Sequence, residues 1–276
     1  MVEKFETKKS LGQHFLTTPT VPKWMCDAGS VSEGDIVLEI GPGTGILTRE
    51  ILSRGAHVIA LEADLRALAV LENDFKKEIG EGRLTLHNTD VRGLDLTTIK
   101  GLKNHKFKVI ANIPYYLSGM LFRLMLESNI QPSQLVYLVQ KEVAKRICVS
   151  RERGEKESIL SLSVKAYGEV KYVKTVSRGH FSPAPRVDSG IILVEKITQE
   201  NFKNLSESFF FELLHIGFGQ KRKQLLGNLS KKYGRDVLTH IFSTLGLPLS
   251  TRAEDLSLEE WLSLTKELAN IPISTD

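Results

Sequence analysis

The chain has 276 residues, which is enough for one sizeable domain and a smaller second one. Hydrophobic residues make up 41% of it and charged residues 25%, as is usual for a soluble globular protein, and the net charge of +4 is only mildly basic. No apolar run approaches the roughly 18 residues of a membrane span, and residues 1–10 are too polar for a signal peptide. We therefore expect a soluble cytoplasmic protein without a membrane partner.

Cysteine and histidine usage argues against a metal site. Cys26 and Cys148 lie far apart and form no C-x-x-C pair, so neither a disulfide framework nor a zinc site is indicated. The seven histidines show no H-E-x-x-H or H-x-E pattern, which argues against a zinc deaminase. We expect no metal.

Apolar runs and helical patterns alternate along most of the chain. The runs predict strands at residues 36–40, 57–61, 84–87, 108–111 and 135–139. The helical patterns lie at residues 21–28, 45–54, 65–79, 117–127, 141–149 and 159–166. Such alternation is typical of an α/β fold, a Rossmann-like parallel sheet with helices on both faces.

Two late strands, residues 172–177 and 190–194, follow with no helix between them. Strands joined in this way are expected to be antiparallel and to lie at one edge of the sheet. After residue 197 the patterns are all helical, at residues 202–217, 221–229, 235–245 and 258–268. We therefore predict an α/β domain at residues 1–198 and a small all-helical domain at residues 199–276.

The helical region carries a cluster of basic residues with no acid among them. Its members are Lys221, Arg222, Lys223, Lys231, Lys232 and Arg235. Clustered charge of one sign is a candidate surface for a polyanion, and a solvated helix face is the alternative.

A glycine-rich loop, EIGPGTG at residues 39–45, ends the first predicted strand and opens the next helix. Glycines at Gly41 and Gly43 allow the backbone to approach a ligand closely, at the point where open α/β sheets bind ligands. A dinucleotide fingerprint would need glycine where Ile46 stands, and the Gly-Lys-Ser/Thr of a P-loop is absent. The G-x-G-x-G form with an acid before it is that of S-adenosylmethionine sites on this fold.

Two acids follow the next two strands. Glu62 ends the second strand, where a carboxylate can accept hydrogen bonds from both ribose hydroxyls of a nucleoside. Asp90 follows the third strand and is positioned to hold the amino group of an adenine. Either acid alone could be a surface carboxylate, but together with the glycine loop they predict a nucleoside cofactor site.

The segment NIPYY, residues 112–116, follows a buried apolar run and offers what the exocyclic amine of a flat base needs. Asn112 has a side-chain carbonyl that can accept a hydrogen bond, and Pro114 fixes the turn and lacks an N–H. Tyr115 or Tyr116 supplies a face for stacking on a base. The alternative is a strand-end turn with a half-buried aromatic.

Taken together, these residues resemble the ribosomal RNA adenine dimethyltransferase family, whose bacterial archetype is the kasugamycin-sensitivity methylase. The resemblance covers nearly the whole chain. It rests on the segments LGQHFL (11–16), EIGPGTG (39–45), NIPYYLS (112–118), FSPAPRVDS (181–189), FGQKRK (218–223) and RAEDL (252–256).

The resemblance implies a fold, a cofactor and a substrate. The fold is a Rossmann-like methyltransferase domain with a helical C-terminal domain, and the cofactor is S-adenosylmethionine. The implied substrate is a pair of adjacent adenosines in the loop of the 3′-terminal hairpin of small-subunit rRNA, within a pre-ribosomal particle. No DNA partner is expected, because the chain has no separate target-recognition domain.

The resemblance also assigns roles to single residues. The cofactor contacts are expected at His14, Leu16, Gly41, Gly43, Glu62, Asp90 and Asn112. Asn112, Pro114 and Tyr115 are the expected catalytic residues, and Tyr115 with Phe181 would stack on the base, unless Phe181 is a core residue. RNA contacts are expected at Arg186, Lys221, Arg222 and Lys223, whereas Arg252 is expected to pair with Glu254 or Asp255.

Two other functions remain as alternatives. A large-subunit rRNA adenine methylase of the antibiotic-resistance type would use the same chemistry, although residues 181–189 and 252–256 favour the small-subunit enzyme. A mainly non-catalytic ribosome assembly factor would bind the immature particle, and it is compatible with methylation. The intact glycine loop and Asn112 favour catalysis.

Overall fold

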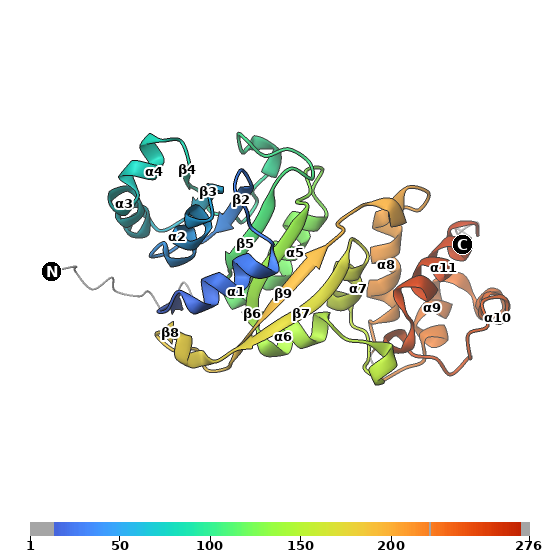
Figure 1. The fold of residues 1–276 in the computed structure, drawn as a ribbon. Helices are drawn as coiled ribbons and strands as arrows, with labels where there is room; N and C mark the ends of the chain where they lie inside the picture. The colour runs from blue at the N-terminus through green and yellow to red at the C-terminus, as the bar shows by residue number, and fades with distance from the viewer. Residues whose placement is uncertain (1–13, 221, 272–276) are drawn as a thin grey trace. The chain divides into compact units, whose positions relative to one another are not determined.

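A seven-stranded mixed sheet, in the order β4-β3-β2-β5-β6-β9-β7, is the centre of the first part of the chain (Figure 1). Five strands are parallel: β2 (Ile36–Ile40), β3 (His57–Glu62), β4 (Leu84–Asn88), β5 (Lys108–Asn112) and β6 (Gln134–Gln140). The late strands β7 (Glu169–Val176) and β9 (Ser189–Glu195) are antiparallel and close one edge. The predicted α/β class and the antiparallel edge are confirmed.

The computed structural model describes residues 14–220 and 222–271, which form two compact units. The first unit extends to Lys145 and resumes over Glu169–Ile197. The second consists of Arg146–Gly168 and the chain from Thr198 onward.

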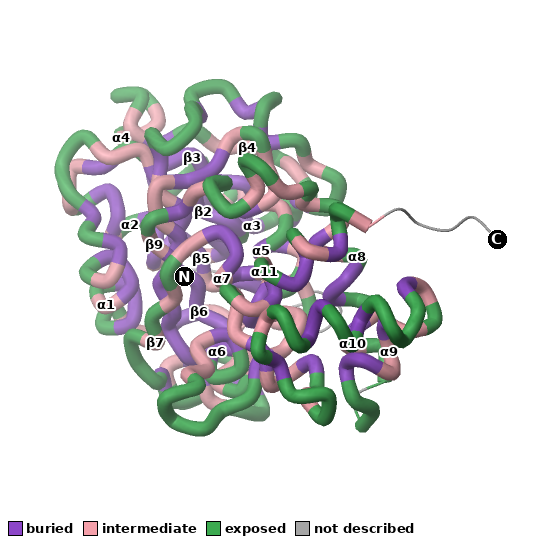
Figure 2. Tube along the Cα trace, turned by 90° about the vertical axis from the view of Figure 1, so that its right-hand side faces the viewer, coloured by how far each residue is buried: buried purple, intermediate pink, exposed green. Residues whose placement is uncertain are grey.

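Helices cover both faces of the sheet in the first unit. They are α1 (Thr20–Ala28), α2 (Ile46–Ser53), α3 (Leu65–Asp74), α4 (Lys76–Gly80), α5 (Ser118–Leu126) and the start of α6 (Lys141–Ile147). On one face, apolar residues of α1, α2 and α3 share a buried core with Val37, Val58 and Ile110 of the strands (Figure 2). On the other face, Phe122 of α5 packs edge-on against the fully buried Tyr137 of β6. The inner strands of the sheet are therefore buried on both sides, as their continuous apolar runs require, whereas the edge strands β4 and β7 are largely exposed.

The second unit is all-helical within the described residues. Its helices are α7 (Ile159–Lys165), α8 (Glu207–Gly217), α9 (Leu225–Tyr233), α10 (Arg235–Thr244) and α11 (Leu258–Ala269). A capping box starts α11, because Ser257 and Glu260 each satisfy the other's backbone N–H. The fully buried Trp261 of that helix donates its indole N–H to the Ala253 carbonyl, 3.2 Å away.

Several predicted boundaries differ from the structure. The single helix expected over residues 65–79 is two helices, because Phe75 leaves the helical conformation and buries its ring beside Gly45. The helix expected from residue 202 begins at Glu207, where the Ser206 hydroxyl caps it, and the one expected at 221–229 is α9, shifted toward the C-terminus. A two-stranded pairing of β1 (Phe15–Leu16) with β8 (Phe181–Ser182) had no counterpart in the sequence analysis.

The grouping of residues 146–168 also differs from the predicted division at 198/199. The sequence predicts that this segment is part of the α/β domain, but it belongs to the helical unit. Its Tyr167 packs against Phe202 and Phe211 and donates its hydroxyl to Glu207 at 2.7 Å. Helix α7 of this segment packs on α8 within the helical unit.

Candidate functional site

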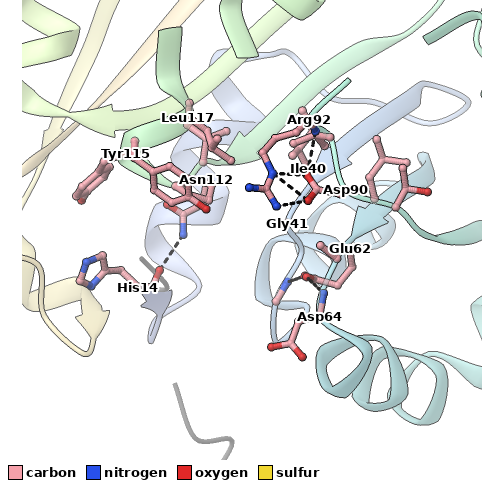
Figure 3. A pocket seen from close by; sticks show the side chains of 18 of the residues that line it. His14, Ile40, Gly41, Glu62, Asp64, Asp90, Arg92, Asn112, Tyr115 and Leu117 are labelled. Atoms are coloured by element: carbon pink, nitrogen blue, oxygen red, sulfur yellow. Dashed lines mark hydrogen bonds and ion pairs between the residues drawn. The ribbon is translucent and has the colours of Figure 1, made fainter. Parts of the chain in front are cut away.

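A cavity lies at the carboxyl ends of β2, β3, β4 and β5 (Figure 3). From β2, the sheet continues through β3 and β4 on one side and through β5 on the other. Such a reversal of strand order is where open α/β sheets bind ligands. Eight of the residues predicted for the site line the cavity: His14, Gly41, Gly43, Glu62, Asp90, Asn112, Pro114 and Tyr115.

The glycine loop forms the floor of this cavity. Gly43 has φ +57°, and a Cβ there would come within 2.6 Å of the Phe15 ring. Gly41 has φ +66°, and a Cβ there would meet nothing within 4 Å, so the loop leaves open space beside it. Glycine is needed at both positions for its backbone conformation, and the room at Gly41 fits a ligand lying on the loop.

Glu62 is nearly fully buried and is held by two backbone donors. Its Oε2 accepts from the Gly43 N–H at 3.1 Å, and its Oε1 accepts from the Asp64 N–H at 2.9 Å. Burial raises the pKa of this carboxyl, while the two hydrogen bonds oppose the shift. Because each oxygen has a second lone pair, the fixed carboxylate can still accept two ligand hydroxyls.

A second acid, Glu39, lies behind the loop. It is 1% exposed, and its Oε2 accepts the Thr48 hydroxyl from the first turn of α2 at 2.7 Å. Burial raises the pKa of Glu39 to about 8, a rise that the Thr48 bond reduces and the nearby Glu62 charge increases. The pair therefore ties the end of β2 to the start of α2, across the glycine loop.

Asp90 lies at the mouth of the cavity, as expected, but its carboxylate already has a partner. Arg92 Nε lies 3.0 Å from Asp90 Oδ1, and Arg92 Nη2 lies 2.5 Å from Oδ2 (Figure 3). The guanidinium holds the pKa of Asp90 below its usual range. Sequence reasoning missed Arg92, which lies only two positions from a predicted site residue.

The NIPYY segment forms the opposite wall, where its side chains are fixed by distant parts of the chain. Asn112 Nδ2 donates to the His14 carbonyl at 3.0 Å, which leaves Oδ1 as the acceptor of this side chain (Figure 3). The His14 ring stacks on Tyr115 at 5.8 Å between centroids, and its Nδ1 lies 2.8 Å from the Pro183 carbonyl. Tyr115 is half-buried, which raises the pKa of its hydroxyl. That hydroxyl lies 2.7 Å from Ser189 Oγ.

Backbone bonds distinguish the two carbonyls beside Asn112. The Pro114 carbonyl accepts the Leu117 N–H at 2.9 Å, as the chain enters a 3₁₀ turn over Tyr115–Leu117. Ile113, which also lines the cavity, is therefore the better source of a second acceptor for an amine. Tyr116 is 61% exposed and lies at the edge of the cavity.

Two of the residues predicted to bind the cofactor or to stack on the base do not line the cavity. Leu16 and Phe181 are each 5% exposed and pair with one another in the β1–β8 register. Both side chains join the core that α1 and α2 share with the sheet. The structure therefore places the Phe181 side chain in the core, together with its strand partner Leu16, and not in the cavity where it was predicted to stack on a base.

The predicted RNA-binding residues lie elsewhere in the two units. Arg186 is exposed in a second, shallow groove of the first unit. Arg222 and Lys223 are exposed before α9 in the second unit, and Lys221 lies outside the described residues. Farther along the predicted basic cluster, Lys232 pairs with Glu212 at 2.5 Å.

The RAEDL segment (252–256) of the second unit is held by a backbone hydrogen bond and an ion pair of Asp255. Asp255 Oδ2 accepts the backbone N–H of Arg252 at 2.8 Å, and the Asp255 carboxylate pairs with Lys156. Lys156, not the predicted Arg252, is therefore the cation in the ion pair that this acid forms.

Two features are absent from the described residues. None of the helices over residues 14–220 and 222–271 is long and apolar enough to cross a membrane. In the same part of the chain, no three of its His, Cys, Asp and Glu side chains gather as a metal site would require.

Comparison with known sequences identifies relatives over nearly the full length. The family model described as ribosomal RNA adenine dimethylase matches residues 4–270. A protein of Dehalococcoides mccartyi named ribosomal RNA small subunit methyltransferase A is 36% identical over 97% of this chain and 90% of its own. The protein of the same name from Bacillus cereus is 34% identical over 97% of this chain and 94% of its own.

Solved structures share the fold. A dimethyladenosine transferase from Plasmodium falciparum matches with a TM-score of 0.71 and 26% identity, over 93% of this chain and 98% of its own. The 23S rRNA methyltransferase ErmE matches with a TM-score of 0.70, over 93% of this chain and 100% of its own. At 21% identity, the likeness to ErmE concerns the fold alone.

Proposed function

The chain belongs to the ribosomal RNA adenine dimethylase family, which uses S-adenosylmethionine, and from this membership we propose that it dimethylates two adjacent adenosines of small-subunit rRNA. The targets we propose lie in the loop of the 3′-terminal hairpin, and each receives two methyl groups on N6. The observation that carries the proposal is the fixed Asn112 carboxamide, whose Nδ2 is held by the His14 carbonyl beside the glycine-loop cavity.

The cavity residues fit a nucleoside-containing cofactor. The open space beside Gly41 accepts a ligand on the loop, and the second lone pairs of the Glu62 carboxylate accept ribose hydroxyls. Asp90 would hold the adenine amino group once its pairing with Arg92 rearranges. When bound, S-adenosylmethionine supplies a methyl group activated by its sulfonium.

The NIPYY segment would provide two hydrogen-bond acceptors for the target amine. The lone pair of an adenine N6 is delocalised into the ring, so the nitrogen is a poor nucleophile. In the first transfer, Asn112 Oδ1 and the Ile113 carbonyl would each accept one N–H, and in the second one of them would accept the N–H that remains. These bonds favour tetrahedral geometry and stabilise the positive charge that develops, and each methylated nitrogen then releases one proton to water. Pro114 shapes the turn that presents these oxygens, and no strong general base is required.

The base must leave its stack to reach these oxygens, at a cost of a few kcal/mol that is smaller in a loop than in a duplex. Tyr115 offers the stacking face in our proposal, held in place by His14 and Ser189. The proposed RNA contacts are Arg186, Lys221, Arg222 and Lys223. They would recognise the RNA mainly through its phosphates and its folded shape.

We also propose that the substrate is a pre-ribosomal particle in the cytoplasm and that binding to it gives the protein a role in small-subunit biogenesis. Catalysis and assembly can be separated in cells. A strain that carries Asn112→Ala in place of the wild-type protein should lose the methylation, yet retain a ribosome profile closer to wild type than a deletion strain does.

The test of the reaction uses the full-length protein, S-adenosylmethionine with a labelled methyl group, and small-subunit particles that lack this modification. We expect label on N6 of two neighbouring adenosines in the 3′-terminal hairpin loop, located by nuclease mapping and mass spectrometry. Large-subunit particles serve as the control. Label on large-subunit RNA alone would contradict the proposal and favour the antibiotic-resistance type of methylase.

A further inference from the structure

A second groove of the first unit is lined mainly by charged side chains, and of these only Arg186 has been given a role, as a proposed RNA contact. Lys141 and Lys145 come from α6, and Arg178 and Arg186 come from the two ends of the segment that links β7 to β9. Two acids, Glu142 and Asp188, lie among these four cations. The groove therefore carries an excess of positive charge.

The cations are available to a ligand. Lys145, Arg178 and Arg186 are exposed, and no carboxylate of residues 14–220 or 222–271 forms an ion pair with their side chains. Asp188 does not cancel them, since its Oδ1 accepts the Arg178 backbone N–H at 3.1 Å and its Oδ2 lies 3.9 Å from Lys141 Nζ. The acid thus organises the groove wall, while three cationic side chains face solvent.

The walls of the groove are rigid. A Cβ on Gly190 would lie 2.7 Å from Ala144 Cβ, so glycine at this position allows α6 to pack directly on β9. The Lys141 backbone N–H donates to the Asp188 carbonyl at 3.0 Å, which ties the start of α6 to the linking segment. Pro185 is buried while Arg186 next to it is exposed, so the segment is anchored and presents its cation outward.

The groove is connected to the proposed catalytic cavity through Tyr115, the proposed stacking residue. Tyr115 is bonded through its hydroxyl to Ser189, and Ser189 follows Asp188 of the groove wall. In the sheet, Ser189 pairs with Gln140, the residue before Lys141. Because parallel strands place their carboxyl ends at one edge, the end of β6 continues the edge formed by the end of β5, where Asn112 lies.

We propose that this groove binds the phosphodiester backbone of the RNA strand next to the flipped adenosine. The inference rests on the proposed function and names where the strand leaves the catalytic cavity. Guanidinium groups suit phosphates because they donate two parallel hydrogen bonds, and lysines add charge. Val187, 46% exposed in the groove, offers an apolar surface to a ribose or base. The contacts carry no base specificity, so they position the strand.

The test combines three substitutions, Lys145→Gln, Arg178→Gln and Arg186→Gln, in the full-length protein. The matched control carries Lys100→Gln, Lys103→Gln and Lys106→Gln, three exposed lysines that precede β5 and lie toward the opposite edge of the sheet. Both variants lose three charges, so a general loss of attraction affects them alike. Urea unfolding of both variants should stay close to wild type, since every changed side chain is exposed.

The first readout is binding of a fluorescent 12-nucleotide oligoadenylate over a series of KCl concentrations. Each lost phosphate contact reduces the salt slope by about 0.7, so the groove variant should lose about 2 and bind roughly tenfold more weakly, while the control changes little. Equal slopes in the two variants would overturn the proposal. Inorganic phosphate is titrated at constant ionic strength. If the substitutions weaken phosphate binding but leave the RNA slope unchanged, the groove is a site for a free anion, which also overturns it.

The second readout is methyl transfer to unmethylated small-subunit particles. The groove variant should raise the KM for particles about tenfold and leave kcat within about threefold, because the substitutions touch neither cofactor nor amine. If the wild-type protein transfers methyl groups and both variants have the wild-type KM, the groove proposal is overturned while the proposed function stands. A wild-type protein that transfers none would instead overturn the proposed function.

Discussion

The proposed catalytic cavity has two walls, the glycine loop with Glu62 (the cofactor wall) and the NIPYY segment (the base wall), and they are built in different ways. The cofactor wall joins residues that are close in the chain: Glu62 bonds to Asp64 two positions away and to Gly43 nineteen away. The base wall depends on distant contacts, since Asn112 bonds to His14 across 98 positions and Tyr115 to Ser189 across 74. A local motif can therefore specify the first wall, whereas only the completed fold can orient the second.

Asn112→Ala is the most direct way to break the base wall. Loss of the acceptor should lower methyl transfer to particles by about 100–1,000-fold, a magnitude typical of removing one preorganised transition-state contact. Urea unfolding should change by only about 1 kcal/mol, since one hydrogen bond to the His14 carbonyl is lost. The exposed Asn129→Ala is the control. Near-wild-type turnover would exclude Asn112 from the chemistry.

Glu39→Gln tests the buried acid behind the cofactor wall through the pH dependence of stability. The pKa of Glu39 is about 8 in the folded chain, against an ordinary value of 4.5. Between these values the folded protein holds a proton that the unfolded chain has released. The free energy of unfolding therefore decreases as pH rises through this window, by up to about 1.4 kcal/mol per pH unit from this group.

Glu39→Gln should remove that slope while keeping an oxygen for Thr48, so the difference between variant and wild type should grow from pH 4.5 to 8. Urea unfolding at several pH values measures it. Parallel curves for the two proteins across the window would show that Glu39 ionises in the fold as it does in water.

Glu62→Gln sharpens the role of the carboxylate in the cofactor wall. A glutamine offers only one acceptor oxygen, so its NH₂ group would oppose one of the two backbone donors, at a cost of about 1–3 kcal/mol in stability. We expect the affinity for S-adenosylhomocysteine, measured by calorimetry, to fall at least tenfold. Glu72→Gln, on an exposed face of α3, is the matched control. Unchanged affinity would place the ribose elsewhere.

The smallest expected effect concerns the hydrogen bond between the Tyr115 hydroxyl and Ser189 Oγ, which Tyr115→Phe and Ser189→Ala test singly and together. Both remove the same hydroxyl contact, so a double-mutant cycle on urea unfolding should give a coupling energy of about 0.5–1.5 kcal/mol. Methyl transfer by Tyr115→Phe should decline less than tenfold, because the ring face remains. Additive effects would mean that Ser189 does not position Tyr115.

The sequence by itself determined the sheet, most helices and the glycine-loop residues that line the cavity. Apolar runs bounded by glycines and acids predicted all five parallel strands, because a strand covered on both faces must be continuously apolar. The loop at Gly41 and Gly43 and the acid Glu62 could be recognised because their spacing along a strand–turn–helix unit fixes their geometry. The NIPYY segment indicated amine binding from residue types alone.

Tertiary structure decided what depended on distant partners. From the sequence, Phe181 could line a cavity or the core, and the structure packs it in the core with Leu16. The helix expected over residues 65–79 breaks where burying Phe75 outweighs helix continuity. Residues 146–168 joined the helical unit through Tyr167. In each case the free energy came from burying apolar surface against residues far away in the chain, which a local pattern cannot specify.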